Sequence, residues 1–113
     1  MVNTIEYSQF LDVDIRVGTI IKAEINVSLI KPSIVLLIDF GSKIGIKKSS
    51  AQIARNYKCE DIINKQIAAV VNFKSKQIGN LLSEVLVLGF PNESREPILV
   101  SPDKKIKNGV RLF

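Results

Sequence analysis

The sequence predicts a mainly β fold with a few short helices. Two observations predict it: short apolar segments rich in Ile, Val and Leu recur along the chain, and Gly, Pro and Asn stand between them. The chain has 113 residues, of which 46% are hydrophobic, so it can bury a core without disulfide bonds or a metal. Because neither a repeat nor a linker divides it, we expect a single domain over residues 1–113.

The N-terminal part is expected to hold one helix and one strand. Tyr7, Phe10 and Leu11 lie at helical spacing, which predicts a short helix with an apolar face for packing. Residues 15–25 are rich in β-branched side chains and predict the first strand, with Gly18 at a bulge or bend. The residues that follow predict a loop.

Two further strands are expected before the middle of the chain. Residues 33–40 are apolar at nearly every position, which predicts a strand that is covered on both faces or lies in a subunit interface. Residues 44–50 predict a third strand, with Ile46 on one face and Lys47 and Ser49 on the other. We expect the second of these faces to present a cation and a hydroxyl together.

The middle of the chain completes the expected barrel. Residues 50–57 predict a brief helix, and residues 66–73 and 83–90 predict strands on either side of a loop that carries Lys74 and Lys76. Five or more short strands, with a small helix between the third and fourth, is the element order of an oligonucleotide-binding (OB) barrel. We therefore expect a five-stranded OB-fold barrel.

Extra elements are expected at both ends of this barrel. Residues 91–97 predict a turn, and residues 98–101 a return strand that completes a hairpin. Asn108 and Gly109 predict a tight turn, after which the apolar final residues indicate a segment held in a sheet or an interface.

The composition argues against an enzyme. Histidine is absent, which removes the Ser-His-Asp and Cys-His nucleophiles and the commonest metal ligand. The single cysteine, Cys59, lacks partners for a disulfide or a zinc cluster. Asp12 and Asp14 have nothing between them to activate, and a capping or surface role is favoured for both. We expect no catalytic residue, no metal site and no cofactor.

The sequence also bears on location. No apolar run approaches the ~18 residues that a membrane-spanning helix needs. The first ten residues lack the basic start and the apolar core of a secretory signal. These features predict a cytoplasmic protein without membrane insertion.

The positive charge is concentrated in the middle of the chain. The net charge is +5, and residues 41–80 carry +6 while the remaining residues sum to −1. This pattern favours a local face for a polyanion, although an ordinary solvated lysine surface is the alternative. RNA binding needs cations for phosphates and flat or apolar side chains for bases. With five Phe, two Tyr and no Trp, a clamp on a bent or looped RNA fits better than a long stacking platform.

An unfolded polypeptide is a second ligand class that the sequence allows. Such a ligand would be held on exposed apolar side chains in or beside the basic loop. The alternative is that all of these side chains belong to the core. The peptide-binding candidates are Phe73, Ile78, Leu81 and Leu82.

Four segments of the chain, in this order and without a large gap, resemble one family. They are LDVDIRVGTIIKAE (residues 11–24), IDFGSKIGIKKSSAQI (38–53), VVNFKSKQIGNLLSEVLVLG (70–89) and SPDKKIKNGVRL (101–112). Together they resemble the CsaA family, which belongs to the wider tRNA-binding-domain superfamily. The match covers nearly the whole chain, so the resemblance is specific.

The resemblance implies a homodimeric OB-fold protein that binds tRNA or other structured RNA, acts as a molecular chaperone in protein export and catalyses no reaction. Leu86 stands where many superfamily members carry methionine, which keeps an apolar contact but loses the adaptable thioether. With the charge argument, the resemblance gives the RNA-binding candidates. They are Lys31, Lys47, Lys48, Ser49, Asn72, Lys74, Lys76, Gln77, Ser83 and Leu86.

Three interpretations stay open from the sequence. The first is an RNA-binding homodimer that also holds unfolded or pre-export polypeptides. The second is a purely RNA-binding protein, specific for tRNA structure, with no chaperone role. The third is a module that mainly dimerises, through the strand at residues 33–40 or through the terminal segment.

Overall fold

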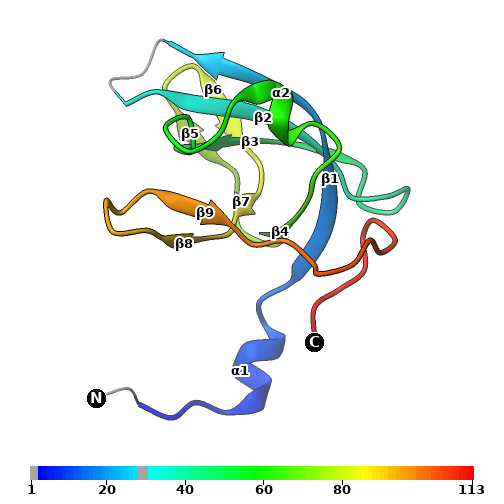
Figure 1. The fold of residues 1–113 in the computed structure, drawn as a ribbon. Helices are drawn as coiled ribbons and strands as arrows, with labels where there is room; N and C mark the ends of the chain where they lie inside the picture. Colours follow the sequence, from blue (N-terminus) through cyan, green and yellow to red (C-terminus); the bar gives the residue numbers. More distant parts are fainter. Residues whose placement is uncertain (1–2, 28–30) are drawn as a thin grey trace.

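A computed structural model describes residues 3–27 and 31–113 of the chain. Its main feature is a curled, five-stranded antiparallel sheet of order β3-β2-β1-β4-β7, accompanied by the hairpins β5–β6 and β8–β9 (Figure 1). The helices are α1 (Tyr7–Leu11) and α2 (Cys59–Ile62). The strands are β1 (Ile15–Asn26), β2 (Ser33–Asp39), β3 (Ile46–Ala51), β4 (Gln66–Val70), β5 (Lys76–Ile78), β6 (Leu81–Ser83), β7 (Leu86–Val87), β8 (Gly89–Pro91) and β9 (Pro97–Leu99).

This architecture confirms the predicted fold class. The protein is mainly β, and α2 stands between the third and fourth strands of a sheet that curls into an OB-like fold. In the part of the chain that the model describes, neither helix has the length and apolar character needed to cross a membrane.

Strand β1 holds the two halves of the sheet together. Its first part, from Ile15 to Thr19, pairs with β4, and its second part pairs with β2. The predicted bulge lies between Ile20 and Lys22, not at Gly18. Gly18 is required for a different reason, since a Cβ there would lie 2.6 Å from Cγ2 of Ile38 and 2.7 Å from Cδ1 of Phe40. The core therefore packs directly on the β1 backbone.

The core fills the inside of the curled sheet. Strand β2 lies between β1 and β3, so both of its edges are paired and its residues are buried or half-buried. This burial fits the prediction that the strand is covered on both faces, and the alternative of a subunit interface along it stays a prediction. The largest fully buried side chains include Phe40, Ile20, Ile34, Leu36, Ile38, Ile53, Ile62 and Ile67.

The helix predicted at residues 50–57 is wrong. Strand β3 continues to Ala51, which pairs with Ile34 of β2, and the Ser50 amide donates a further hydrogen bond to Oγ of Ser83 (3.1 Å). Ile53 is then buried in the core, and only a turn forms, in which the Tyr57 amide donates to the Ile53 carbonyl (3.1 Å). The helix forms later, as α2. Burial of Ile53 outweighs the weak local preference for a helix.

The central segment is also more divided than predicted. Strand β4 ends at Val70, three residues early, because the Asn72 side chain binds the linker before β1: it donates to the Asp12 carbonyl (2.8 Å) and accepts from the Asp14 amide (3.0 Å). Residues 83–90 are shared among β6, β7 and β8. The predicted basic loop contains the β5–β6 hairpin, which turns at Gly79 with φ +60°.

The C-terminal elements form as predicted. Strands β8 and β9 pair as a hairpin, with Phe90 opposite Ile98. The last residues then run beside β1, where the amides of Gly109 and Leu112 donate to the carbonyls of Val17 (2.8 Å) and Ile15 (2.8 Å). The prediction that this segment is held against a sheet is confirmed.

Helix α1 forms where predicted, but it does not pack on the barrel. None of its residues is buried, and Tyr7 and Leu11 are 66% and 44% exposed. In Figure 1 it lies below the sheet, at the end of the linker to β1, and the Arg111 side chain donates a hydrogen bond to its Leu11 carbonyl (2.6 Å). The apolar face predicted from sequence is therefore uncovered among the described residues.

An ion-pair cluster joins the C-terminal segment to the start of β1. Arg16 donates from Nε (2.6 Å) and Nη2 (3.2 Å) to the Asp14 carboxylate, and Nε of Arg111 lies 3.5 Å from Oδ1 of Asp14. The hydrogen bond from Arg16 is the main cause that lowers the pKa of Asp14 below its usual value. Partial burial acts in the opposite direction, and the charges of Arg16 and Arg111 reinforce the lowering.

This lowered pKa predicts a loss of stability in acid. The ionised Asp14 stabilises the folded state above the unfolded-state pKa of about 3.9, and this contribution disappears as the pH falls through the lower folded-state pKa. Asp14→Asn should therefore flatten the acid part of the stability curve, measured by urea unfolding between pH 7 and pH 2.5. Asp12→Asn serves as the control, and identical curves for Asp14→Asn and the unmodified protein would contradict the prediction.

Candidate nucleic-acid interface

A hollow of about 320 Å³ lies beside the β5–β6 hairpin, and we call it the hairpin cleft. It collects residues from three separate segments: the end of β3, the stretch that leads into β5, and the stretch from β6 to β7. Six of the sequence candidates meet here. They are Phe73, Lys74, Lys76, Ile78, Ser83 and Leu86.

The inner wall of the hairpin cleft is a seam between β3 and residues 83–85. The Lys48 amide donates to Oε1 of Glu84 (2.9 Å), and the Glu84 amide donates back to the Lys48 carbonyl (2.7 Å). Since β3 is the last strand on its side of the sheet, these bonds satisfy edge groups that would otherwise lack partners. The seam closes this side of the curled sheet and fixes the wall of the cleft.

Two serines predicted to bind RNA belong to this seam. Ser49 is 1% exposed and its hydroxyl donates to the Val85 carbonyl (3.1 Å). Ser83 is 7% exposed, and its hydroxyl lies within hydrogen-bond distance of Ser49 and Val85. The face of β3 expected to be polar and accessible is therefore turned inward, while Ile46 on the other face is exposed. The curl of the sheet reverses the predicted orientation, and Ser49 is not available to a ligand.

The accessible part of the hairpin cleft combines charge with apolar surface. Phe73 is 54% exposed and Leu86 is 49% exposed. Lys74 and Lys76 are exposed, and neither ammonium group lies within 4 Å of a carboxylate oxygen among the described residues. The cleft thus offers free cations beside a flat side chain and an aliphatic one, the combination that single-stranded RNA requires.

The remaining RNA candidates lie outside the cleft. Lys48 is exposed on the seam, and Lys47 is half-buried. Lys31 lines a separate hollow of about 310 Å³. The Asn72 side chain is occupied by the linker before β1, and the Gln77 side chain donates to the Gly79 carbonyl (2.9 Å), within the hairpin turn.

The four peptide-binding candidates are not core residues. Phe73 and Leu82 are exposed, and Ile78 and Leu81 are half-buried. The alternative that all four belong to the core is therefore wrong. Of the four, Phe73 and Ile78 line the hairpin cleft.

Sequence reasoning missed three residues of the hairpin cleft, namely Ser50, Glu84 and Val85. Glu84 is the most consequential, because it adds a carboxylate to the hollow that Lys74 and Lys76 also line. It was found only through the pairing of β3 with residues 83–85, which joins positions far apart in the sequence. The local sequence Ser-Glu-Val at residues 83–85 gives no indication that Glu84 pairs with Lys48 of β3.

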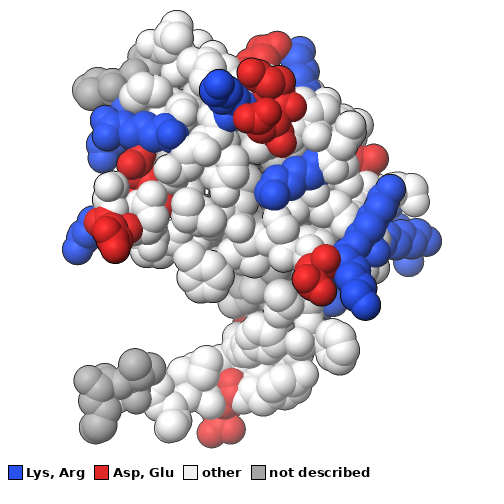
Figure 2. Space-filling model, in the orientation of Figure 1, with Lys and Arg blue, Asp and Glu red and all other residues white. Residues whose placement is uncertain are grey.

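Figure 2 shows how the charges are distributed on one face. Basic side chains gather at the upper left and at the right edge, where the C-terminal loop lies in Figure 1. The N-terminal arm, residues 3–14 with helix α1, shows no basic side chain in this view. The second basic group was not expected, because the sequence outside residues 41–80 has a net charge near zero.

Comparison with known proteins is consistent across family, sequence and structure. Residues 15–111 match the family described as "Putative tRNA binding domain" (tRNA_bind). The chain is 29% identical to the methionine–tRNA ligase of Parabacteroides distasonis and 32% identical to that of Methanothrix thermoacetophila, in each case over 93% of this chain and 15% of the ligase. The chain thus spans about 15% of the length of these curated relatives.

Solved structures match over the whole length. The chaperone CsaA of Bacillus anthracis superposes with a TM-score of 0.92 at 41% identity, covering 98% of this chain and all of that chain. The CsaA chaperone protein of Picrophilus torridus gives a TM-score of 0.90 at 46% identity, covering 97% and 100%. The chain therefore belongs to the tRNA-binding domain family and, within it, to the CsaA family.

Proposed function

We propose that this protein binds tRNA, or another structured RNA, through the hairpin cleft. The observation that carries the proposal is that two lysines without a carboxylate partner in residues 3–27 and 31–113 meet the exposed Phe73 and Leu86 in one hollow. In OB folds, ligands bind on the face of the second and third strands and at the loop between the fourth and fifth. The β5–β6 hairpin, which leads from β4 to β7, occupies that loop position.

Each side chain has a distinct role in this proposal. Lys74 and Lys76 neutralise phosphates, and Phe73 stacks on a base, a contact worth about 1–3 kcal/mol. Glu84 repels phosphate and accepts hydrogen bonds, so it faces the amino group of a base and not the backbone. A single aromatic ring, that of Phe73, suits one unstacked base in a loop or at a bend of the RNA.

The direct test is binding of bulk tRNA, followed by fluorescence anisotropy at several KCl concentrations between 50 and 300 mM. The logarithm of the binding constant should fall linearly with the logarithm of the salt concentration, because phosphate contacts release counterions. Absence of binding at the lowest salt, or binding that does not depend on salt, would contradict the proposal.

A second candidate function is favoured by the exposed apolar side chains of the β5–β6 region. Phe73, Leu82 and Leu86 lie next to or within the hairpin cleft and are each about half exposed. We propose that they hold unfolded or pre-export polypeptides, as a chaperone would. The solved relatives named as CsaA chaperones support this proposal.

The chaperone function is tested with heat-denatured citrate synthase as the client. Stoichiometric protein should suppress its aggregation, and added tRNA should abolish the suppression if both ligands occupy the hairpin cleft. If the protein does not reduce the aggregation of citrate synthase, the chaperone function is contradicted and the purely RNA-binding interpretation remains. Suppression that persists with saturating tRNA would place the client elsewhere.

We also propose a homodimer built by the N-terminal arm. Helix α1 carries no charged residue and presents Tyr7 and Leu11 without cover. An apolar groove of about 350 Å³ lies between β1 and the C-terminal segment, lined among others by Ile15, Val100 and Leu112; we call it the C-terminal groove. Insertion of one protomer's α1 into the partner's C-terminal groove would cover both surfaces in a closed, two-fold arrangement.

These proposals describe a binding protein and not an enzyme. Within residues 3–27 and 31–113, no group of three or more His, Cys, Asp or Glu side chains is placed to hold a metal ion. Both tRNA and newly made polypeptides awaiting export are found in the cytoplasm, and we propose that location.

A further inference from the structure

A larger hollow, of about 600 Å³, lies apart from the hairpin cleft. It is formed by β1, the residues that lead into β4, and the loop of residues 101–108. Lys65, Lys104, Lys105 and Lys107 are among its lining residues, and we call it the lysine pocket. No function proposed above uses it.

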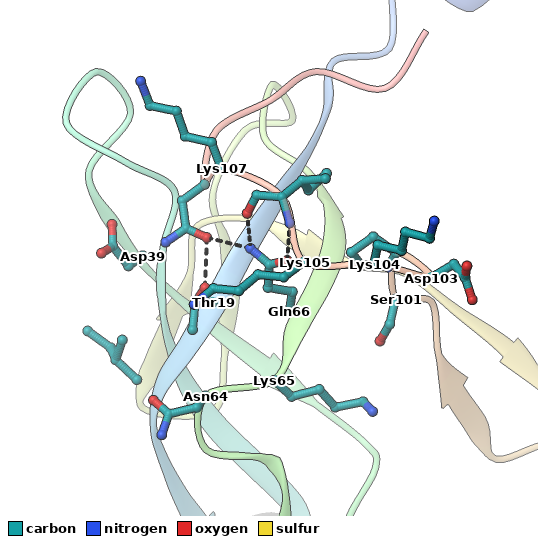
Figure 3. Close-up of a pocket in the computed structure, with 14 residues that line it drawn as sticks. Thr19, Asp39, Asn64, Lys65, Gln66, Ser101, Asp103, Lys104, Lys105 and Lys107 are labelled. Carbon is teal, nitrogen blue, oxygen red and sulfur yellow. Dashed lines mark hydrogen bonds between the residues drawn. The ribbon is translucent and has the colours of Figure 1, made fainter.

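The wall of the lysine pocket is built by side-chain hydrogen bonds. Gln66, in β4, donates to the Ile106 carbonyl and to Oδ1 of Asn108 (3.1 Å), and it accepts from the Ile106 amide (3.0 Å). The Thr19 hydroxyl also donates to Oδ1 of Asn108 (2.7 Å). Figure 3 shows Gln66 at the centre of these bonds, with the lysines arranged around it. The loop is therefore held in one shape, which lowers the entropic cost of binding a ligand there.

The end of the loop is fixed as well. Gly109 has φ +90°, and a Cβ at this position would clash with the Phe40 carbonyl oxygen. Only glycine permits this close approach. The loop is thus anchored at Ile106, Asn108 and Gly109, while its lysine side chains extend from a rigid frame.

The lysine pocket has an unbalanced positive charge. Its four lysines face two aspartates, Asp39 and Asp103, which leaves a net charge of +2. Oδ1 of Asp39 already accepts from the Gly41 amide (2.8 Å). Among the described residues, no carboxylate oxygen lies within 4 Å of any of the four ammonium groups. In Figure 3, Lys65 and Lys104 extend to one side of the pocket and Lys107 to the other.

The lining also indicates what kind of ligand fits. The described lining residues include neither Phe nor Tyr, so a base has no ring on which to stack. The pocket is open and offers ammonium groups together with polar side chains and backbone groups. These features suit phosphate and ribose, the sequence-independent part of a nucleic acid.

We propose that the lysine pocket is a second RNA contact, which binds backbone phosphates of the same RNA whose unstacked bases enter the hairpin cleft. This inference rests on the proposed RNA-binding function. The hairpin cleft would bind bases and adjacent phosphates, and the lysine pocket would set the orientation of the RNA without reading its sequence. Clustered lysines repel one another in the free protein, and bound phosphates relieve that repulsion.

The test compares salt dependence in two variants that lose the same charge. Lys104→Ala with Lys105→Ala should reduce the slope of log binding constant against log salt by about one to two for bulk tRNA. Lys22→Ala with Lys58→Ala removes two lysines that line none of the hollows described above, and it should leave the slope unchanged. The ion pair of Lys22 with Glu24 is exposed, so its loss is expected to cost little stability.

Two further measurements separate an RNA contact from a structural role. The Lys104→Ala, Lys105→Ala variant should melt at the same temperature as the unmodified protein or higher, since it loses charge repulsion. Lys104→Arg with Lys105→Arg keeps the charge and should restore the original slope. A lower melting temperature together with no rescue by arginine would overturn the inference in favour of a structural role.

The failure of this inference is distinct from the failure of the proposed function. If the unmodified protein binds tRNA and the Lys104, Lys105 variant behaves like the Lys22, Lys58 control, only the second contact is overturned. If the unmodified protein does not bind tRNA at low salt, the proposed function fails and the second contact fails with it.

Discussion

Replacing both Lys74 and Lys76 by alanine is expected to weaken tRNA binding and to reduce its salt dependence by about one to two in the log–log slope. Both ammonium groups line the hairpin cleft, and neither has a carboxylate partner among the described residues. Each is therefore free to displace one counterion from a phosphate. Anisotropy titrations of labelled bulk tRNA at four or more salt concentrations measure the slope directly.

The matched control for this experiment is again Lys22→Ala with Lys58→Ala, which lowers the net charge by the same amount. If the control and the Lys74, Lys76 variant flatten the slope equally, binding follows overall charge, and the hairpin cleft is not the site. Phe73→Ala provides a second measurement, because it should lower the affinity for tRNA at every salt concentration without changing the log–log slope. A stacking contact removes apolar surface and releases no counterion.

The second large effect concerns the N-terminal arm. Tyr7→Asp combined with Leu11→Asp should convert the proposed dimer into a monomer at micromolar concentration. A two-fold arrangement buries each side chain twice, and each is worth about 1.5–3 kcal/mol when fully buried. Loss of four such contacts should raise the dissociation constant at least ~10³-fold. Sedimentation velocity over a concentration series measures the change.

Val27→Asp is the control for this substitution, since Val27 is an exposed apolar residue directly after the last residue of β1. It should leave the dimer intact. A Tyr7, Leu11 variant that still sediments as a dimer would exclude the arm as the contact. An unmodified protein that sediments as a monomer at micromolar concentration would exclude the dimer itself. Because helix α1 buries no residue within its own chain, the monomeric variant should still unfold cooperatively in urea. Its midpoint should not depend on protein concentration, whereas the midpoint of the dimeric protein should rise with it.

The sequence was sufficient for the strands whose apolar pattern is long and regular. The strands predicted at residues 15–25 and 33–40 form β1 and β2 to within one residue, and the hairpin around residues 91–97 forms where its turn residues indicate. Prediction was wrong where a distant contact decides a local choice. Residues 50–57 do not form a helix, because Ser50 bonds to Ser83 and Ile53 enters the core. Residues that far apart leave no periodic signal in the sequence.

In the candidate site, too, residues in a local pattern were predicted correctly, and residues placed by distant contacts were not. Phe73, Lys74, Lys76, Ile78 and Leu86 were identified from a local pattern of charge beside apolar residues, and they do line one hollow. Ser49 and Ser83 were assigned to the ligand from strand alternation and resemblance, but the curl of the sheet turns them into the seam. The alternation of side chains along a strand shows which residues share a face, but it does not show which face a ligand can reach.

Charge summed over a long stretch of sequence was misleading in one respect. The residues outside 41–80 have a net charge of −1, which concealed Lys104, Lys105 and Lys107 within a single loop. Lys65 joins them only because Gln66 binds that loop to β4. Electrostatic fields depend on distances in space, so the sequence shows the amount of charge and the fold shows where it acts.

The sequence by itself determined the mainly β fold, the absence of histidine chemistry, the family and the basic segment beside β5. These features depend on composition and on neighbours along the chain, which a sequence states directly. Only the tertiary structure decided that Ser49 and Ser83 close the barrel, that Glu84 enters the hairpin cleft, that α1 lies uncovered and that four lysines share one pocket. Each of these depends on contacts between residues far apart in the chain, and the curl of the sheet, not the local sequence, sets those distances.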